Sequence, residues 1–186
     1  MPRRFLQFVC LALVALLNFH VRVEAVDSAA GLEYKVKGAF LFNFAKFTEW
    51  PADSFSTPAS PLLIGVFPSD PAAPILKQVL NAATVNGRPL LLKWLTPDDD
   101  LRSCHLIFLS RAEKDRAASV IAAVKDAPVV TVGETERFAH DGGIINFIQR
   151  DGSVRLEINL VAAERVGLKM SSKLAGMGKL VKGGRN

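Results

Sequence analysis

The sequence predicts a single α/β domain, a three-layer sandwich with a mostly parallel sheet and a C-terminal antiparallel hairpin. Three observations predict this fold class. Short apolar runs of strand length alternate with segments of helical periodicity after residue 60. The turn pair Asp151-Gly152 separates two strand-like runs near the C-terminus. The chain has 186 residues, a length that suits one domain with its own hydrophobic core.

Residues 1–25 have the features of a cleaved signal peptide. Arg3 and Arg4 precede an apolar run from Phe5 to Phe19, and Val23-Glu24-Ala25 offers a cleavage site. The apolar run is shorter than the roughly 20 residues that span a bilayer, so we expect cleavage rather than an anchor. The folded domain is therefore expected to comprise residues 26–186 and to reach an oxidising space outside the inner membrane.

The charge of the chain argues against a nucleic-acid partner. The formal net charge is +5. Arg3, Arg4, Arg22 and Glu24 contribute +2 of this charge and leave with the leader, so the exported domain carries about +3. This balance is too mild to suggest nucleic acid, and export argues against it further.

The segment from Glu33 to Pro51 is exceptionally rich in aromatic side chains and predicts a helix that Pro51 ends. Such a helix is apolar around most of its circumference, so we expect it to be buried in its own domain or against a second chain. Phe42 lies in the middle of the only polar sector, where a core role and a partner-facing role are equally open. The apolar face comprises Val36, Phe40, Phe44 and Phe47, and the polar sector comprises Lys35, Lys46 and Glu49.

The rest of the chain divides into alternating elements. A helix is expected at Ala72–Ala82, capped by Asp70, and a second amphipathic helix at Arg111–Ala127. A short helical turn is expected at Thr135–His140 and another at Val161–Arg165. Apolar runs predict buried strands at Leu62–Phe67, Leu90–Leu95, Leu106–Leu109 and Pro128–Val132.

The closing hairpin joins Ile144–Arg150 to Ser153–Leu160. Apolar residues alternate along its second strand with Arg155, Glu157 and Asn159, which predicts one core face and one polar, wet face that Asn146 joins. A last helix is expected at Leu174–Val181, where Gly176 and Gly178 weaken it.

No constellation of residues points to catalysis, so we expect no enzyme activity, no cofactor and no metal. Glycine-rich phosphate loops and nucleophile elbows are absent from the sequence. Cys104 and His105 are neighbours on a presumed strand, so their side chains point to opposite faces. The acidic run Asp98–Asp100 is expected to be a helix start or a solvated loop rather than a metal site.

Cys104 is the one cysteine outside the leader, which excludes an intramolecular disulfide. It opens an apolar run, so we expect it to be buried at the end of a strand. A disulfide between two chains is the minority alternative.

Two long blocks resemble the YfiR-like family of bacterial periplasmic proteins. YKVKGAFLFNFAKFTEWP (34–51) resembles the start of the mature family members, and LEINLVAAERVGLKMSSKLAGMGKLV (156–181) resembles their closing block. Shorter matches lie between them at VNGRPL (85–90) and CHLIFLS (104–110). Each motif is weak alone, but their order and spacing are fairly specific and cover nearly the whole mature chain.

The resemblance implies a periplasmic homodimer that represses a membrane-bound diguanylate cyclase by binding its periplasmic sensor region. An OmpA-like outer-membrane lipoprotein sequesters such repressors, and the output is cytoplasmic cyclic di-GMP, with effects on biofilm formation and motility. Family members that carry cysteine pairs differ from this chain, so a redox role is not carried over. The partner-binding residues that we expect are Phe42, Lys46, Arg155, Glu157, Arg165, Leu168 and Lys169.

Two other functions remain open. The first is a periplasmic sensor in which Arg155, Glu157, Arg165 and Lys169 line a pocket for a small anionic or zwitterionic molecule. The second is an accessory subunit of another envelope system.

Overall fold

The structure is a computed structural model that describes residues 29–69 and 73–183. The expected signal peptide and Asp70 lie outside the described residues. Residues up to Glu33 and residues from Tyr34 onward form separate units, and the second unit contains the α/β sheet. Within the described ranges, no helix combines the length and apolar character that crossing a membrane requires.

Helices and strands alternate as the sequence predicts. The helices are α2 (Ala29–Lys46), α3 (Ala73–Leu80), α4 (Ala117–Ala123), α5 (Leu160–Arg165) and α6 (Ser172–Ala175), with the 3-10 helices η1 (Ala52–Ser54), η2 (Leu101–Ser103) and η3 (Arg111–Arg116). The strands are β1 (Thr48–Glu49), β2 (Leu62–Val66), β3 (Thr84–Val85), β4 (Arg88–Trp94), β5 (Leu106–Leu109), β6 (Val130–Gly133), β7 (Ile145–Arg150), β8 (Ser153–Ile158), β9 (Lys169–Met170) and β10 (Lys179–Leu180).

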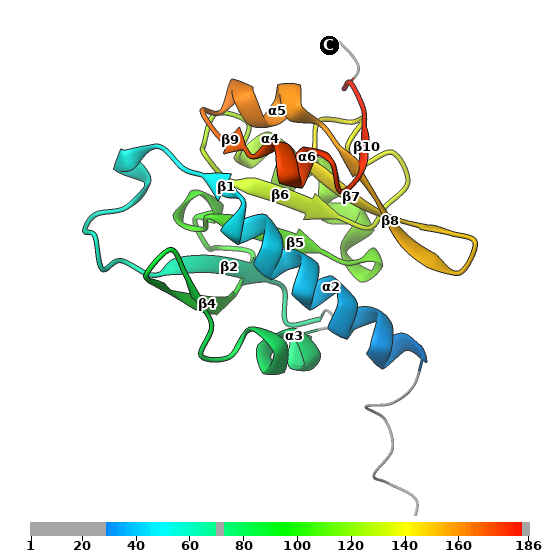
Figure 1. Cartoon of the computed structure of the whole chain (residues 1–186), viewed down its shortest axis with the longest axis horizontal. Coiled ribbons are helices and arrows are strands. Elements are labelled where there is room, and N and C mark those ends of the chain that lie inside the picture. Colours follow the sequence, from blue (N-terminus) through cyan, green and yellow to red (C-terminus); the bar gives the residue numbers. More distant parts are fainter. Residues whose placement is uncertain (1–28, 70–72, 184–186) are drawn as a thin grey trace, which may run out of the picture. The chain divides into compact units, whose positions relative to one another are not determined.

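An eight-stranded sheet of the described residues forms the middle layer, in the order β10-β8-β7-β6-β5-β2-β4-β3 (Figure 1). The strands from β7 to β4 run parallel to one another. β8 returns antiparallel to β7 through the Asp151-Gly152 turn, where φ is 52° and 70°. The predicted parallel sheet with a closing hairpin is therefore confirmed.

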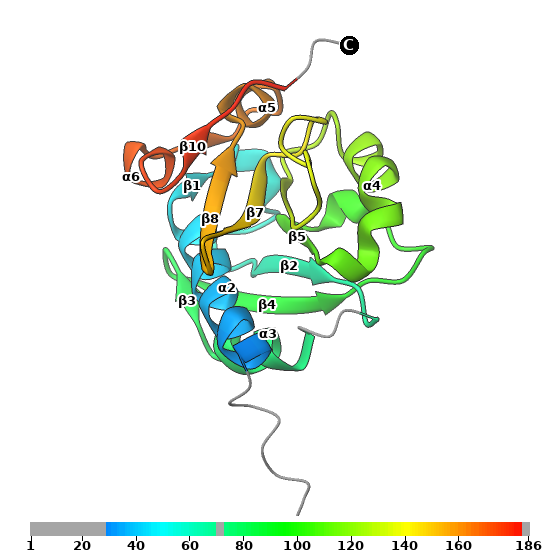
Figure 2. The same ribbon diagram turned by 90° about the vertical axis from the view of Figure 1, so that its right-hand side faces the viewer.

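Helices cover both faces of the sheet (Figure 2). α2 and α3 cover one face, where Leu41 and Phe44 of α2 join the larger core with alternate residues of the central strands. α4 covers the other face, where Val120 and Val124 join a second core with Ile107 and further strand residues. All four residues of β5 are buried, because a central parallel strand with both faces covered has no wet side.

Two predictions for the aromatic helix were wrong, namely the residue at which it ends and the composition of its buried face. α2 ends at Lys46, and Thr48–Glu49 form β1 instead, because this segment pairs with β9. Val36, expected on the buried face, is 39% exposed. Lys37 is buried instead at 1% exposure and forms an ion pair with Glu134 over 2.7 Å.

The predicted final helix was also wrong. The chain forms only the short α6 and then adds β10 beside β8. A Cβ atom at Gly178 would lie 2.7 Å from Cβ of Leu156, so glycine lets the chain approach β8 closely.

The segment predicted as one amphipathic helix is two. It divides into η3 and α4, with a kink at Glu113 (φ −102°, ψ 19°), whose side chain is buried. Ser69 and Arg116 both donate to the carboxylate of Glu113, which explains why it points inward. The segment Thr135–His140 forms turns rather than a helix.

Candidate functional site

A basic and aromatic surface lies at the C-terminal end of α2. Phe47 is half-buried there, and the ammonium groups of Lys46 and Lys173 lie 5.7 Å and 4.8 Å from its ring centroid. Ammonium groups at this distance are attracted to an aromatic ring. Lys46, Phe47, Lys169 and Lys173 are called the α2-end surface below.

Backbone pairing brings the parts of the α2-end surface together from distant positions in the chain. β1 pairs antiparallel with β9, so that Glu49 lies opposite Lys169. The backbone N–H of Ser171 donates to the carbonyl oxygen of Phe47 over 3.0 Å. The hydroxyl of Ser171 accepts from the N–H of Leu174 and caps α6, which carries Lys173.

The C-terminal segment that supplies Lys169 and Lys173 is rich in basic side chains. Residues 160–183 contain one acidic side chain, Glu164, and the five basic side chains Arg165, Lys169, Lys173, Lys179 and Lys182. All five are exposed, and no ion pair joins any of them to another residue in the part of the chain that the structure describes. The arrangement favours an acidic partner, because unpaired exposed cations attract opposite charge over a Debye length.

A hollow of about 200 Å³ adjoins the surface beyond β1. The guanidinium of Arg88 lies 3.8 Å from the ring centroid of Phe55 and donates to the carbonyl oxygens of Thr57 and Ser60. Arg88 thereby fixes the loop after β1 to the sheet. The hollow is lined by Thr48, Glu49, Trp50, Phe55, Leu62, Val85, Asn86 and Arg88.

His105 lies behind this hollow and is neutral for geometric reasons. Its Nδ1 accepts from the backbone N–H of Leu63 over 3.1 Å, so Nε2–H donates to the carbonyl oxygen of Ser54. The ring stacks on Phe55 at 4.4 Å. Burial lowers the pKa of His105, and the nearby positive charge of Arg88 lowers it further.

We expect His105 to make the protein less stable in mild acid. A lowered pKa means that the unfolded chain, near pKa 6.5, binds a proton more readily than the folded chain. The free energy of unfolding should therefore be constant above about pH 6.5 and fall as the pH drops below it, by about 1.4 kcal/mol for each pH unit until the folded pKa is reached. Urea unfolding between pH 5 and 7.5 measures this slope. His105→Gln should flatten it, and an unchanged slope in this variant would contradict the assignment.

Two of the predicted contact residues lie wholly or partly in the core. Phe42 is half-buried and packs against the larger core. Leu168 is 1% exposed in the same core, so it supports the α2-end surface from within rather than facing a partner. Lys46 and Lys169 are exposed and belong to the surface, and Arg165 lies on α5, which contacts β9.

Arg155 and Glu157 lie elsewhere, on the face of β8 opposite α2. Asn146 is paired with Glu157 across the hairpin, as expected, but it is fully buried, so this face is not uniformly wet. The Nε2 of His140 lies 3.8 Å from the carboxylate of Glu157. The pocket expected from Arg155, Glu157, Arg165 and Lys169 corresponds to neither of two hollows in this domain. None of the four residues lines the 200 Å³ hollow or the 430 Å³ cavity between η2 and α4.

Among the described residues, no three or more His, Cys, Asp and Glu side chains form a group that could hold a metal ion. Cys104 is a free, buried thiol, and burial raises its pKa. The burial expected for Cys104 is confirmed, but the residue lies at the C-cap of η2, two positions before β5 begins.

Sequence reasoning missed Phe47 and Lys173 as members of the surface. The sequence pattern predicted that Phe47 is a core aromatic residue and that Lys173 is an ordinary residue at the start of a helix. Only the pairing of β1 with β9, which joins two dipeptides about 120 positions apart, places them together. Such short strands leave no periodic pattern in a sequence.

Comparison with known proteins gives a family and a fold. Residues 34–179 match the YfiR/HmsC-like family. A conserved domain protein from Vibrio cholerae O1 biovar El Tor strain N16961 has a similar solved structure, with a TM-score of 0.54 and 14% sequence identity. That similarity covers 80% of this chain and 60% of the other, and it concerns the fold alone. No curated protein matches the chain at a significant level.

Proposed function

Because the chain belongs to the YfiR/HmsC-like family, whose members are regulators linked to diguanylate cyclases, we propose that it is a periplasmic repressor of a membrane-bound diguanylate cyclase. It binds the periplasmic sensor region of the cyclase and so lowers cytoplasmic cyclic di-GMP, which alters biofilm formation and motility. The protein does not act on the nucleotide, which is made on the other side of the membrane.

The α2-end surface is the observation that supports this proposal within the molecule. It combines an accessible aromatic ring with exposed cations that lack ion-pair partners among the described residues. Aromatic and basic side chains of this kind are enriched where proteins bind other proteins. A rigid base holds the surface, since β1, β9 and α6 are tied to α2 by backbone hydrogen bonds.

Repression follows from mass action. A soluble repressor that binds the inactive conformation of its receptor more tightly shifts the receptor toward that conformation, to the extent of the difference in affinity. An OmpA-like outer-membrane lipoprotein that competes for the repressor would relieve the repression. We include a homodimer in the proposal, with the twofold symmetry that is usual for such assemblies.

The test is the cyclic di-GMP content of cells in which the gene is deleted and then restored. Deletion should raise cyclic di-GMP, and the chain with its leader should lower it again. The chain without residues 1–25 should have no effect, because it does not reach the periplasm. Unchanged cyclic di-GMP after deletion, in a strain that makes and exports the protein, would refute the proposed function.

Charge-reversed variants locate the binding surface in the same experiment. The double variant Lys169→Glu with Lys173→Glu should be exported and folded but fail to lower cyclic di-GMP. The matched control is Lys77→Glu with Lys114→Glu, which makes the same change of charge at exposed positions on α3 and η3. Equal repression by the two double variants would place the cyclase on another surface.

A further inference from the structure

We propose that a second site, a cavity of about 430 Å³ between η2 and α4, binds a small oxyanion with an apolar body. The anion is a carboxylate or a phosphate. The site is separate from the α2-end surface, and the proposal does not depend on the function proposed above. The cavity is lined by Phe67, Thr96, Pro97, Asp99, Asp100, Leu101, Arg102, Arg116, Ser119, Val120 and Ala123.

The position of the cavity is one at which open α/β sheets bind ligands. Phe67 directly follows β2, Thr96 follows β4, and Arg116 lies on the segment that follows β5. The helix after β2 packs on the α2 side of the sheet, whereas the helices after β5 pack on the other side. Connections from the neighbouring strands β2 and β5 therefore diverge at their carboxyl ends, which makes this edge a topological switch point.

Arg116 is held with its guanidinium against an aromatic ring in the cavity. Its Nε lies 2.7 Å from the carboxylate of Glu113, which is buried and also accepts from Ser69. Its guanidinium lies 5.1 Å from the ring centroid of Phe67. An arginine anchored through Nε keeps its two terminal nitrogens for a ligand, and these match the two oxygens of a carboxylate or phosphate.

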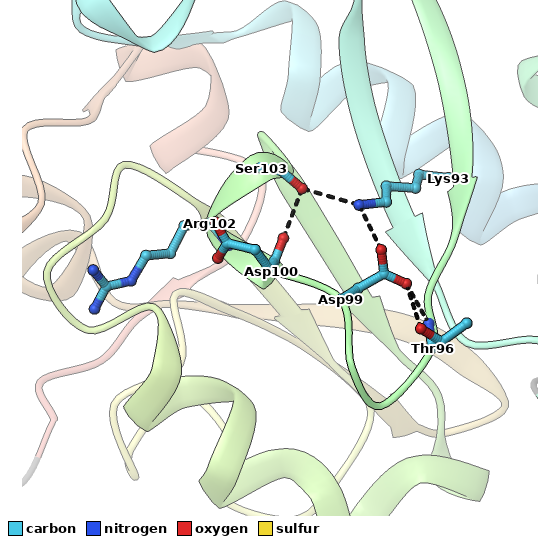
Figure 3. Close-up of polar contacts among 6 residues, drawn as sticks. All are labelled: Lys93, Thr96, Asp99, Asp100, Arg102 and Ser103. Atoms are coloured by element: carbon cyan, nitrogen blue, oxygen red, sulfur yellow. Dashed lines mark hydrogen bonds and ion pairs between the residues drawn. The ribbon is translucent and has the colours of Figure 1, made fainter.

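Arg102 also lines the cavity and is likewise anchored through its Nε. Its Nε donates to the carbonyl oxygen of Ala123 over 3.1 Å, and this bond turns the side chain toward α4. Figure 3 shows the guanidinium pointing away from the Lys93–Asp99 contact. Two guanidinium groups thus flank the cavity, and each is bound to the protein through Nε.

The carboxylates that line the cavity are already engaged with the protein. Asp99 accepts from Lys93 over 2.9 Å and from the N–H and hydroxyl of Thr96 over 2.7 Å each (Figure 3). The hydrogen bond from Lys93, together with those from Thr96, holds the pKa of Asp99 well below its usual range. Asp100 accepts from the backbone N–H of Arg102 and caps η2. The ammonium of Lys93 offsets the charge of Asp99 and so reduces the repulsion that an entering anion would meet.

The apolar lining of the cavity indicates what the body of the ligand is, apart from its anionic group. Phe67 and Val120 are buried and Leu101 is half-buried, and these side chains give the cavity an apolar part beside its polar groups. The volume lies in the range of small-molecule sites, which combine an apolar lining with a few polar groups that fix orientation. A compact anion with a ring or short hydrocarbon body fits this pattern better than a bare inorganic ion.

Phenyl phosphate is the probe that tests the proposal, titrated calorimetrically into the purified exported protein at low ionic strength. It should bind more tightly than inorganic phosphate, because its ring contacts the apolar lining. Arg102→Gln should weaken binding at least about tenfold, the expected result of losing a charge-assisted hydrogen bond. Ala123→Phe should abolish binding by filling the cavity without changing its charge.

Two matched controls separate the cavity from general effects. Ala122→Phe adds the same ring to the neighbouring exposed position of α4, and Arg137→Gln removes an exposed arginine far from the cavity in sequence. Both should bind phenyl phosphate as the unchanged protein does. The proposal is overturned if phenyl phosphate does not bind, if inorganic phosphate binds as tightly, or if Arg102→Gln and Ala123→Phe bind it normally.

Discussion

Replacing Lys37 with methionine is expected to destabilise the protein by about 3–5 kcal/mol, the usual cost of leaving one charge of a buried ion pair without its partner. The ammonium of Lys37 and the carboxylate of Glu134 lie 2.7 Å apart, and both side chains are almost fully buried. The rings of Tyr34 and Phe147 lie 4.8 Å and 5.9 Å from the same ammonium. Methionine fills the space but removes the ammonium that lies against the buried carboxylate of Glu134. Urea unfolding at pH 7 measures the loss.

The double variant separates the ion pair from the packing. Lys37→Met combined with Glu134→Leu removes both charges and should recover most of the stability lost by Lys37→Met alone. Lys77→Met, an exposed position on α3, should change the free energy of unfolding by no more than about 0.5 kcal/mol. A loss of less than 1 kcal/mol in Lys37→Met would show that the ion pair does not fix α2 to the end of β6.

Phe138→Ala is expected to cost about 3–5 kcal/mol, because the ring fills a closed space between two stretches of backbone. The ring is 2% exposed, in the core beneath α4. Gly133 and Gly143 contact it closely, and a Cβ atom at Gly143 would lie 2.2 Å from a ring carbon and 2.8 Å from the carbonyl oxygen of Phe138. Gly143→Ala should therefore cost about 3 kcal/mol through overpacking. Thermal and urea unfolding of both variants provide the measurement.

The combination of the two variants supplies the control. Phe138→Ala removes the ring that the methyl group at position 143 would meet. The contact of this methyl group with the carbonyl oxygen of residue 138 remains. The double variant should then lose less stability than the sum of the two single losses, which is a departure from additivity. If the two losses add in full, the contact with the carbonyl oxygen of Phe138 is the cause and the ring contact is not.

The sequence by itself determined the fold class and most of the sheet. The apolar run at Leu106–Leu109 is a strand with exactly the predicted bounds, and Asp151-Gly152 forms the predicted hairpin turn. These features are local, because a buried parallel strand and a two-residue turn each require particular residue types at adjacent positions. The blocks at both ends of the chain likewise carried the family resemblance, and the match over residues 34–179 agrees with it.

Only the tertiary structure decided which side chains meet. A helical wheel places Lys37 between Leu41 and Phe44, which are both fully buried, and a carboxylate from the end of β6 makes the burial of its charge possible. The strand character of Thr48–Glu49 depends on Lys169–Met170, and the two arginines of the 430 Å³ cavity come from η2 and η3. A residue that is distant in sequence can make the burial of a charge or an extended backbone favourable. The residues next to that charge or backbone in the sequence do not show which distant residue will do so.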